Sequence, residues 1–210
     1  MRRLWWTGLA AAAALAALAF AGGASLAGPA FGPFSFFAAG GATAEWTKAV
    51  AHEGRFAVKL DNPLPTGSAY AGLWVGGISG TPLSDLQELG FSVTGYIGAG
   101  APRFSLLLDD GTVLWLSALY CDDLDTGSPD WKTVDFVNGA CTIYDSAGHT
   151  HTSWSDVVAA HSDATVSALF LILDEGPATS YVDDIVIGIE GLHVRYGEPR
   201  DNGVPHRLEP

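Results

Sequence analysis

The sequence predicts an all-β protein in which two antiparallel sheets pack as a β-sandwich with one or two short helices. Glycine and proline, which favour turns, make up 37 of the 210 residues. Between them lie about eleven short apolar or alternating segments, the pattern of strands. Hydrophobic residues make up 48% of the chain, enough for a sizeable core. Many short strands with almost no helix are typical of a sandwich.

A hairpin and a central strand are the clearest elements. Residues 103–108 and 112–120 are apolar runs joined by a turn ending in Asp110-Gly111, which predicts a β-hairpin. Residues 166–173 are nearly all apolar, as in a strand covered on both faces. Other strands are expected at residues 34–37, 45–51, 55–60, 70–77, 89–96, 131–137, 141–144, 181–189 and 192–196.

Two short helices are expected. Ser153 and Asp156 have the spacing of a capping box, which predicts a helix of two or three turns that starts there. Residues 82–86, which begin with a proline, are expected to form a single further turn of helix.

The start of the chain has the features of an export signal. Arg2 and Arg3 precede an apolar run at residues 4–21, and small residues at its end fit a signal-peptidase site. We expect a signal peptide at residues 1–21, or cleavage as late as residue 27, and a secreted protein. A retained membrane anchor is the alternative, because about 20 apolar residues span a bilayer.

The remaining chain is expected to be one domain. We assign residues 33–197 to the β-sandwich, with flexible segments at residues 22–32 and 198–210, which contain Gly and Pro. The net charge of −13 argues against binding to nucleic acid or to an anionic membrane surface, because both require clustered Lys and Arg.

Cys121 and Cys141 are the two cysteines of the chain. An oxidising compartment favours a disulfide between them, which on the loop-entropy model would contribute roughly 3 kcal/mol to stability. A catalytic or metal-binding pair is the alternative, although a spacing of twenty matches no close zinc pair.

Two stretches resemble carbohydrate-binding modules, the galactose-binding-like jelly rolls. Residues 51–60 (AHEGRFAVKL) are similar to the early hairpin of these domains, and residues 181–187 (YVDDIVI) are similar to their closing strand. The resemblance implies a jelly-roll sandwich. It also implies a structural calcium ion on an early acidic residue and an Asp of the closing strand, matched here by Asp183 and Asp184. The early strand lacks the acidic residue, and Glu45 is the candidate to replace it.

Two further groups could bind metal. Asp122, Asp123 and Asp125, followed by Gly127 and Asp130, place several carboxylates on one loop, as calcium requires, and a solvated acidic loop is the alternative.

His149 and His151 would point to one side of an extended segment. With His161 or Asp145 as a third ligand they could bind zinc or copper, and two surface histidines are the alternative.

Aromatic residues indicate a binding surface. Trp74 and Trp115 each lie between two apolar residues, so alternation sends them to the other face of their strands. If these strands are neighbours, one sheet face would present Trp74, Tyr96, Arg103 and Trp115. Sugars stack on such aromatic faces. Burial of the tryptophans in the core is the alternative.

The leading hypothesis is a secreted, non-catalytic domain that binds a polysaccharide or cell-surface glycan. A structural or adhesive subunit that assembles through residues 31–37 is the first alternative. A polysaccharide lyase or hydrolase is the second, which the absence of H-E-x-x-H, G-x-S-x-G and phosphate-loop patterns disfavours.

Overall fold

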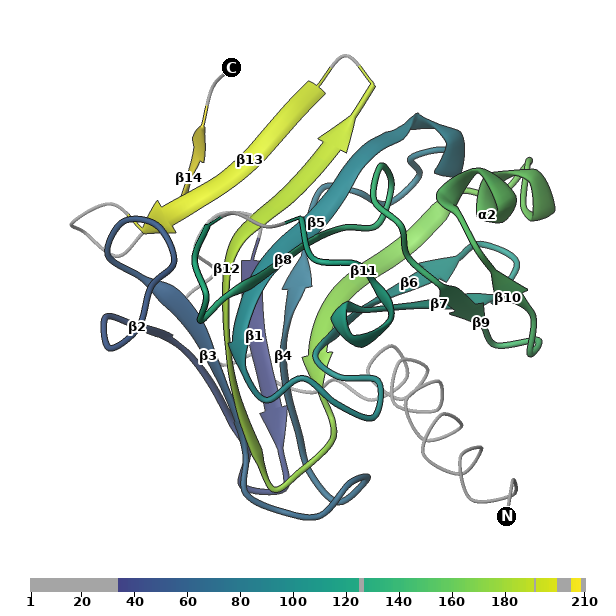
Figure 1. Ribbon diagram of the computed structural model, residues 1–210. Helices are drawn as coiled ribbons and strands as arrows, with labels where there is room; N and C mark the ends of the chain where they lie inside the picture. Colours follow the sequence, from purple (N-terminus) through teal and green to yellow (C-terminus); the bar gives the residue numbers. More distant parts are fainter. Residues whose placement is uncertain (1–33, 125–126, 191, 200–204, 209–210) are drawn as a thin grey trace.

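The computed structural model describes residues 34–124, 127–190, 192–199 and 205–208. Two antiparallel sheets face each other (Figure 1). The predicted all-β, two-sheet sandwich is therefore confirmed. The regions expected to form the signal peptide and the N-terminal flexible segment lie outside the described residues. No helix among the described residues is long and apolar enough to cross a membrane.

The first sheet, sheet A, contains seven strands. In spatial order they are β1 (Phe34–Ala39), β4 (Tyr70–Val75), β11 (Val166–Leu173), β6 (Arg103–Leu108), β7 (Val113–Ser117), β9 (Ile143–Asp145) and β10 (Thr150–His151). The predicted hairpin is β6 and β7, and the predicted central strand is β11, which lies between β4 and β6. Because β1 pairs with β4 of the same chain, the described part of the segment considered for assembly is already a strand of sheet A.

The second sheet, sheet B, is built around β12 (Ala178–Ile189). One edge of β12 pairs with β5 (Leu86–Gly95), which also pairs with β8 (Lys132–Asp135). The other edge pairs first with β3 (Ala57–Asn62) and then with β13 (Leu192–Pro199). β2 (Thr43–Thr47) and β14 (Pro205–Leu208) complete the sheet. Strand β14 lies within the segment expected to be a flexible tail.

The helices are short. Helix α2 (Trp154–Ala160) begins after Ser153, whose hydroxyl accepts a hydrogen bond from the Asp156 backbone N–H at 3.2 Å. This confirms the predicted helix start. Two 3₁₀ turns cover Leu83–Asp85, as expected from the sequence, and Ala118–Tyr120.

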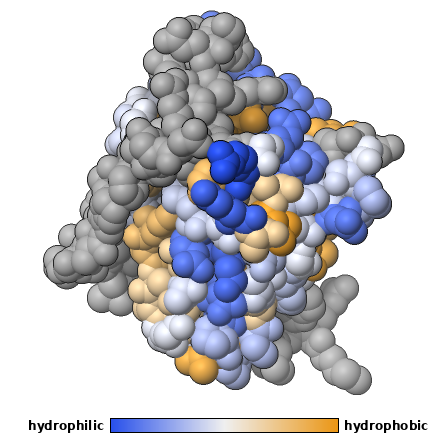
Figure 2. Space-filling model, turned by 90° about the vertical axis from the view of Figure 1, so that its left-hand side faces the viewer, coloured by the Kyte–Doolittle hydropathy of each residue, from blue (hydrophilic) through white to orange (hydrophobic). Residues whose placement is uncertain are grey.

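The main core lies between the sheets. Three phenylalanines meet at its centre, with Phe91 of sheet B and Phe104 of sheet A at a centroid distance of 5.1 Å and Phe136 against both. Alternation fills the rest, because successive residues of a strand point to opposite faces. Figure 2 shows a different surface, on the side of β2 and β3, where hydrophilic residues separate small apolar patches.

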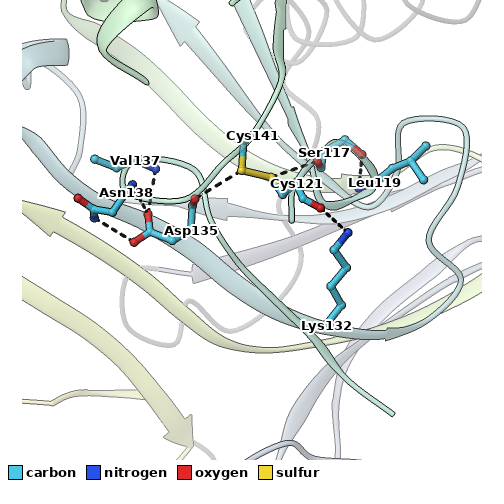
Figure 3. Close-up of a disulfide and its surroundings, with 8 residues drawn as sticks. All are labelled: Ser117, Leu119, Cys121, Lys132, Asp135, Val137, Asn138 and Cys141. Atoms are coloured by element: carbon cyan, nitrogen blue, oxygen red, sulfur yellow. Dashed lines mark hydrogen bonds between the residues drawn. A yellow bond between two sulfur atoms is a disulfide. The ribbon is translucent and has the colours of Figure 1, made fainter. Parts of the chain in front are cut away.

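The predicted disulfide between Cys121 and Cys141 is present (Figure 3). It joins the end of the 3₁₀ turn after β7 to the turn after β8. Lys132 Nζ donates a hydrogen bond to the Cys121 carbonyl oxygen at 2.7 Å, and Asp135 Oδ1 accepts hydrogen bonds from the Val137 and Asn138 backbone N–H groups. A disulfide is consistent with an extracellular domain.

Candidate functional site

The outer face of sheet A, the face directed away from the main core, carries a second and smaller apolar cluster. We call this the outer aromatic cluster, and it consists of Phe37, Tyr70, Trp74, Phe170 and Ile172. Phe170 and Ile172 are buried, whereas the other three side chains are partly exposed. Sandwich sheets normally present polar residues on this side, so an apolar cluster here requires an explanation.

The cluster is assembled from β1, β4 and β11. Trp74 packs against Phe170 at a centroid distance of 4.7 Å and against Phe37 at 5.4 Å. The Phe37 ring lies over Gly72. A side chain at position 72 would collide with both this ring and the Leu171 carbonyl oxygen. Trp74 is therefore held from two sides while part of its indole remains exposed, as the predicted binding role requires.

A cross-strand row extends this face toward β7. The ladder aligns Trp74 with Phe170, Phe170 with Ser105, and Ser105 with Trp115. Trp115 lies on the predicted face, but only 7% of it is exposed. The expectation that it forms an exposed platform with Trp74 is therefore wrong, because Trp115 is buried and Trp74 is not.

Arg103 also lies on the outer face, but its guanidinium is already paired. Its two terminal nitrogens donate hydrogen bonds to the Asp174 carboxylate at 2.7 and 2.6 Å, and Arg103 is only 3% exposed. Such a bidentate pair fixes the orientation of both groups. Arg103 thus forms part of the predicted face, but most of its donors are not free for a ligand.

Tyr96 is the one predicted residue that belongs to neither face of sheet A. It follows β5 of sheet B and packs partly against the main core. Its hydroxyl donates a hydrogen bond to Glu175 Oε2 at 3.1 Å, next to Asp174. Burial raises the pKa of Glu175 to about 7, and the neighbouring Asp174 carboxylate adds to the rise against the opposing effects of Tyr96 and Arg103.

Three buried polar atoms of the outer face have no hydrogen-bond partner. They are Arg103 Nε, Ser105 Oγ and Trp115 Nε1. Ser105 is the direct ladder neighbour of Trp115 and is two residues from Arg103. Buried polar groups in folded proteins are almost always paired with protein, water or ligand atoms. Three unpaired atoms on one face therefore mark a place where water or a polar ligand would complete the hydrogen bonding.

The residues expected to bind calcium are engaged in other interactions. The Asp183 carboxylate accepts hydrogen bonds from the backbone N–H groups of His52, Glu53 and Asp184, and Asp184 pairs with the His52 ring. Burial and the charge of Asp184 raise the pKa of Asp183 to about 6. A carboxylate surrounded by N–H donors does not favour a cation, so this geometry gives the calcium expectation no support. Instead, these hydrogen bonds and the His52–Asp184 pair join residues 51–60 to residues 181–187, the two stretches that resemble carbohydrate-binding modules.

The acidic loop is solvated where it is described. Asp122 and Asp123 are exposed, and Asp123 Oδ1 accepts a hydrogen bond from the Thr133 backbone N–H at 3.1 Å. Asp125 lies outside the described residues. Within the described part of the chain, neither Asp122 nor Asp123 belongs to a group of side chains close enough to hold a metal ion.

Sequence reasoning missed several residues of the outer face. The sequence pattern places Phe37 and Phe170 in strands and indicates no role for them, and Asp174 and Glu175 follow β11 without any motif. Alternation along β11 could have placed Phe170 opposite Leu169 and Leu171. The partner of Arg103 could not be found this way, because 71 positions separate it from Asp174.

The chain is similar in fold to solved carbohydrate-binding modules. The C-terminal family 22 module of Clostridium thermocellum Xyn10B has 16% identity and a TM-score of 0.35, over 80% of this chain and 92% of that module. A family 30 module has 14% identity and a TM-score of 0.35, over 70% and 84%. A xylan-binding family 22 domain has 16% identity and a TM-score of 0.32, over 80% and 94%. No protein-family model and no curated protein sequence matches this chain.

Proposed function

We propose that the outer face of sheet A binds a saccharide. The observation that carries this proposal is the combination on one face of a supported, partly exposed Trp74 and three unpaired polar atoms. A sugar ring has an apolar C–H face that stacks on an indole, and hydroxyl groups that both donate and accept hydrogen bonds. A purely apolar ligand would leave the polar atoms unpaired.

The two halves of the face have different roles in this proposal. The outer aromatic cluster supplies the stacking surface, and Trp74 is its ligand-contacting member. The polar half is organised by the Arg103–Asp174 pair, which stays in place while Ser105 Oγ and Trp115 Nε1 offer hydrogen bonds. Both atoms are buried, so the ligand must displace the groups that cover them, and we expect slow association.

The test is binding of the purified protein to a panel of polysaccharides by pull-down and titration calorimetry. Trp74→Ala is expected to weaken binding about tenfold, because stacking contributes roughly 0.5–1.5 kcal/mol beyond the loss of buried area. Trp74→Phe, which keeps a ring, is expected to recover part of the affinity. The cost in stability should stay below the roughly 3–5 kcal/mol of a fully buried tryptophan.

Trp46→Ala is the matched control. Trp46 lies in β2 of sheet B and packs edge-on to Phe36 at 5.7 Å, on the side of the main core. The Trp46→Ala substitution is expected to lower the stability of the protein while leaving its affinity for the saccharide unchanged. Equal affinities of wild-type protein and Trp74→Ala for every ligand that binds would refute the proposal, as would the absence of binding to the whole panel.

A further inference from the structure

A second group of polar side chains lies at the far edge of sheet A, remote from the outer aromatic cluster in the strand order. Asp145 is the last residue of β9, His151 is the last residue of β10, and His161 follows helix α2 directly. The β9–β10 hairpin sets Asp145 and His151 on neighbouring strands, and α2 folds back beside β10 (Figure 1). Two segments of the chain thus bring three metal-ligating residues together.

The distances within this group match a metal coordination sphere. Asp145 Oδ2 lies 3.3 Å from His151 Nε2 and 3.8 Å from His161 Nε2, and the three ligand atoms all lie within 4.8 Å of one another. Ligands about 2.0–2.1 Å from a tetrahedral zinc ion are about 3.3 Å apart. The group is therefore close to its coordinating arrangement without the ion, and a contraction of less than about 2 Å completes it.

Burial distinguishes this group from an ordinary cluster of polar side chains at the surface. The Asp145 side chain is fully buried, and its ion-pair partners are all histidines. His161 Nε2 is buried and has no hydrogen-bond partner although it points toward this carboxylate. A buried carboxylate is costly unless it is paired or binds a metal ion. Burial alone would raise the pKa of Asp145, but hydrogen bonds from His149 and His151 outweigh this effect and lower it.

A surface depression borders the group on the side of His161. His161 is one of the residues that line a surface depression of about 420 Å³. Three carboxylate residues, Asp109, Asp110 and Asp163, line the same depression, with Ala160, Ser162 and Ala164. Carboxylates at the mouth of a cleft raise the local concentration of cations. A metal ion could therefore approach His161 from this side.

We propose that Asp145, His151 and His161 form a zinc site that fastens helix α2 to the edge of sheet A. Two imidazole nitrogens and one carboxylate oxygen are ligands typical of zinc and unlike the all-oxygen ligand sets of calcium and magnesium. The fourth position is left to water. His149, which is 70% exposed, is a hydrogen-bond partner of Asp145 and not one of the three ligands. His151 is thus common to the site expected from the sequence and to the proposed one, whereas His149 lies beside it as a hydrogen-bond partner of Asp145.

The experiment uses the full chain stripped with a chelator and titrated with Zn²⁺ alone. We expect one zinc ion per chain, a rise in the unfolding midpoint, since a ligand that binds only the folded state stabilises it, and no comparable effect of Ca²⁺. Co²⁺ in place of zinc should give the visible absorption of a bound, low-symmetry ion. None of these readouts involves a saccharide, so this test and that of the proposed function succeed or fail independently.

Substitutions identify the ligands. His151→Ala and His161→Ala should each weaken zinc binding at least about tenfold to a hundredfold, the loss that removal of a mere second-shell partner already produces. His52→Gln is the matched control, because His52 is paired with Asp184 of sheet B. This variant should bind zinc as the wild type does. Circular dichroism of the metal-free variants establishes that they are folded, and His151→Gln or His161→Gln replaces the corresponding alanine variant if it is not. Unchanged affinity in a folded His161 variant, or an equal loss in His52→Gln, would overturn the proposal.

Discussion

Arg103 shows how a buried charge organises the outer face of sheet A. Its bidentate pair with Asp174 lies at the end of β11, beside Glu175 and the hydroxyl of Tyr96. Breaking a buried pair by removal of one partner generally costs more than replacing both groups with apolar ones, because it leaves an uncompensated charge. The pair therefore fixes the position of Arg103 and, through it, the polar half of the proposed saccharide site.

Glu175 makes the stability of this region depend on pH. Its pKa is raised from 4.5 in the unfolded chain to about 7 in the folded protein, chiefly by burial. The folded state therefore binds the proton more tightly than the unfolded state. The stabilisation is fully present below pH 4.5 and is lost as the pH rises through about 7. We predict that the unfolding midpoint of Glu175→Gln falls less steeply than that of the wild type over this range.

Thermal unfolding at half-unit pH steps measures the effect. The comparison with Glu175→Gln removes the contributions of other groups, including that of Asp183, whose pKa is also raised. Glu45→Gln, at an exposed position of β2, should follow the wild-type profile. Parallel curves for wild type and Glu175→Gln from pH 4.5 to pH 7 would contradict the prediction.

Among the elements, β4 links the main core to the outer face. Ala71, Leu73 and Val75 point into the main core, while Tyr70, Gly72 and Trp74 point outward. A glycine is required in the second set, because the Phe37 ring and the Leu171 carbonyl oxygen occupy the space of a side chain. The absence of a side chain at Gly72 thus allows Phe37 of β1 to pack against Trp74.

We predict that Gly72→Ala destabilises the protein by about 1–3 kcal/mol, the usual cost of overpacking. Because Phe37 would have to move, the same substitution should also weaken saccharide binding. Denaturant unfolding and the binding assay used for Trp74→Ala measure both effects. Ser35→Ala, on the neighbouring strand opposite Trp74, is a control that inserts nothing into the face and should change stability little. A Gly72→Ala protein as stable as the wild type would show that the aromatic packing is looser than described.

For the whole molecule, the disulfide provides a covalent link between the chain leaving sheet A after β7 and the segment that follows β8 of sheet B. It closes a loop over a sequence separation of 20 residues. Replacing both Cys121 and Cys141 by Ser is predicted to lower the free energy of unfolding by about 3 kcal/mol, because the open chain gains entropy when unfolded.

Denaturant unfolding with and without a reductant tests this prediction. Reduction should lower the stability of the wild type to that of the double variant and should leave the double variant unchanged. Labelling of the unfolded, unreduced protein should find no free thiol. Two reactive thiols per chain would show that the protein lacks the bond.

The local pattern of the sequence determined the strands and the start of α2, and the presence of two cysteines in the chain determined their pairing. The strands and the helix start depend on residues close in sequence: the Asp110-Gly111 turn sets the β6–β7 hairpin, and the Ser153 hydroxyl caps α2 by accepting a hydrogen bond from the Asp156 backbone N–H three positions further on. Alternation also correctly assigned Trp74 and Trp115 to the face opposite their apolar neighbours.

Only the tertiary structure decided which of these residues are exposed and which ones meet. Burial depends on the other strands and loops that cover a face, so Trp115 is buried while Trp74 is not. The partners Arg103 and Asp174, and the members Asp145 and His161 of the proposed zinc site, are brought together by strand order and by the packing of α2, which no spacing along the chain encodes. Periodicity specifies the face of a strand, whereas a site requires the positions of several strands at once.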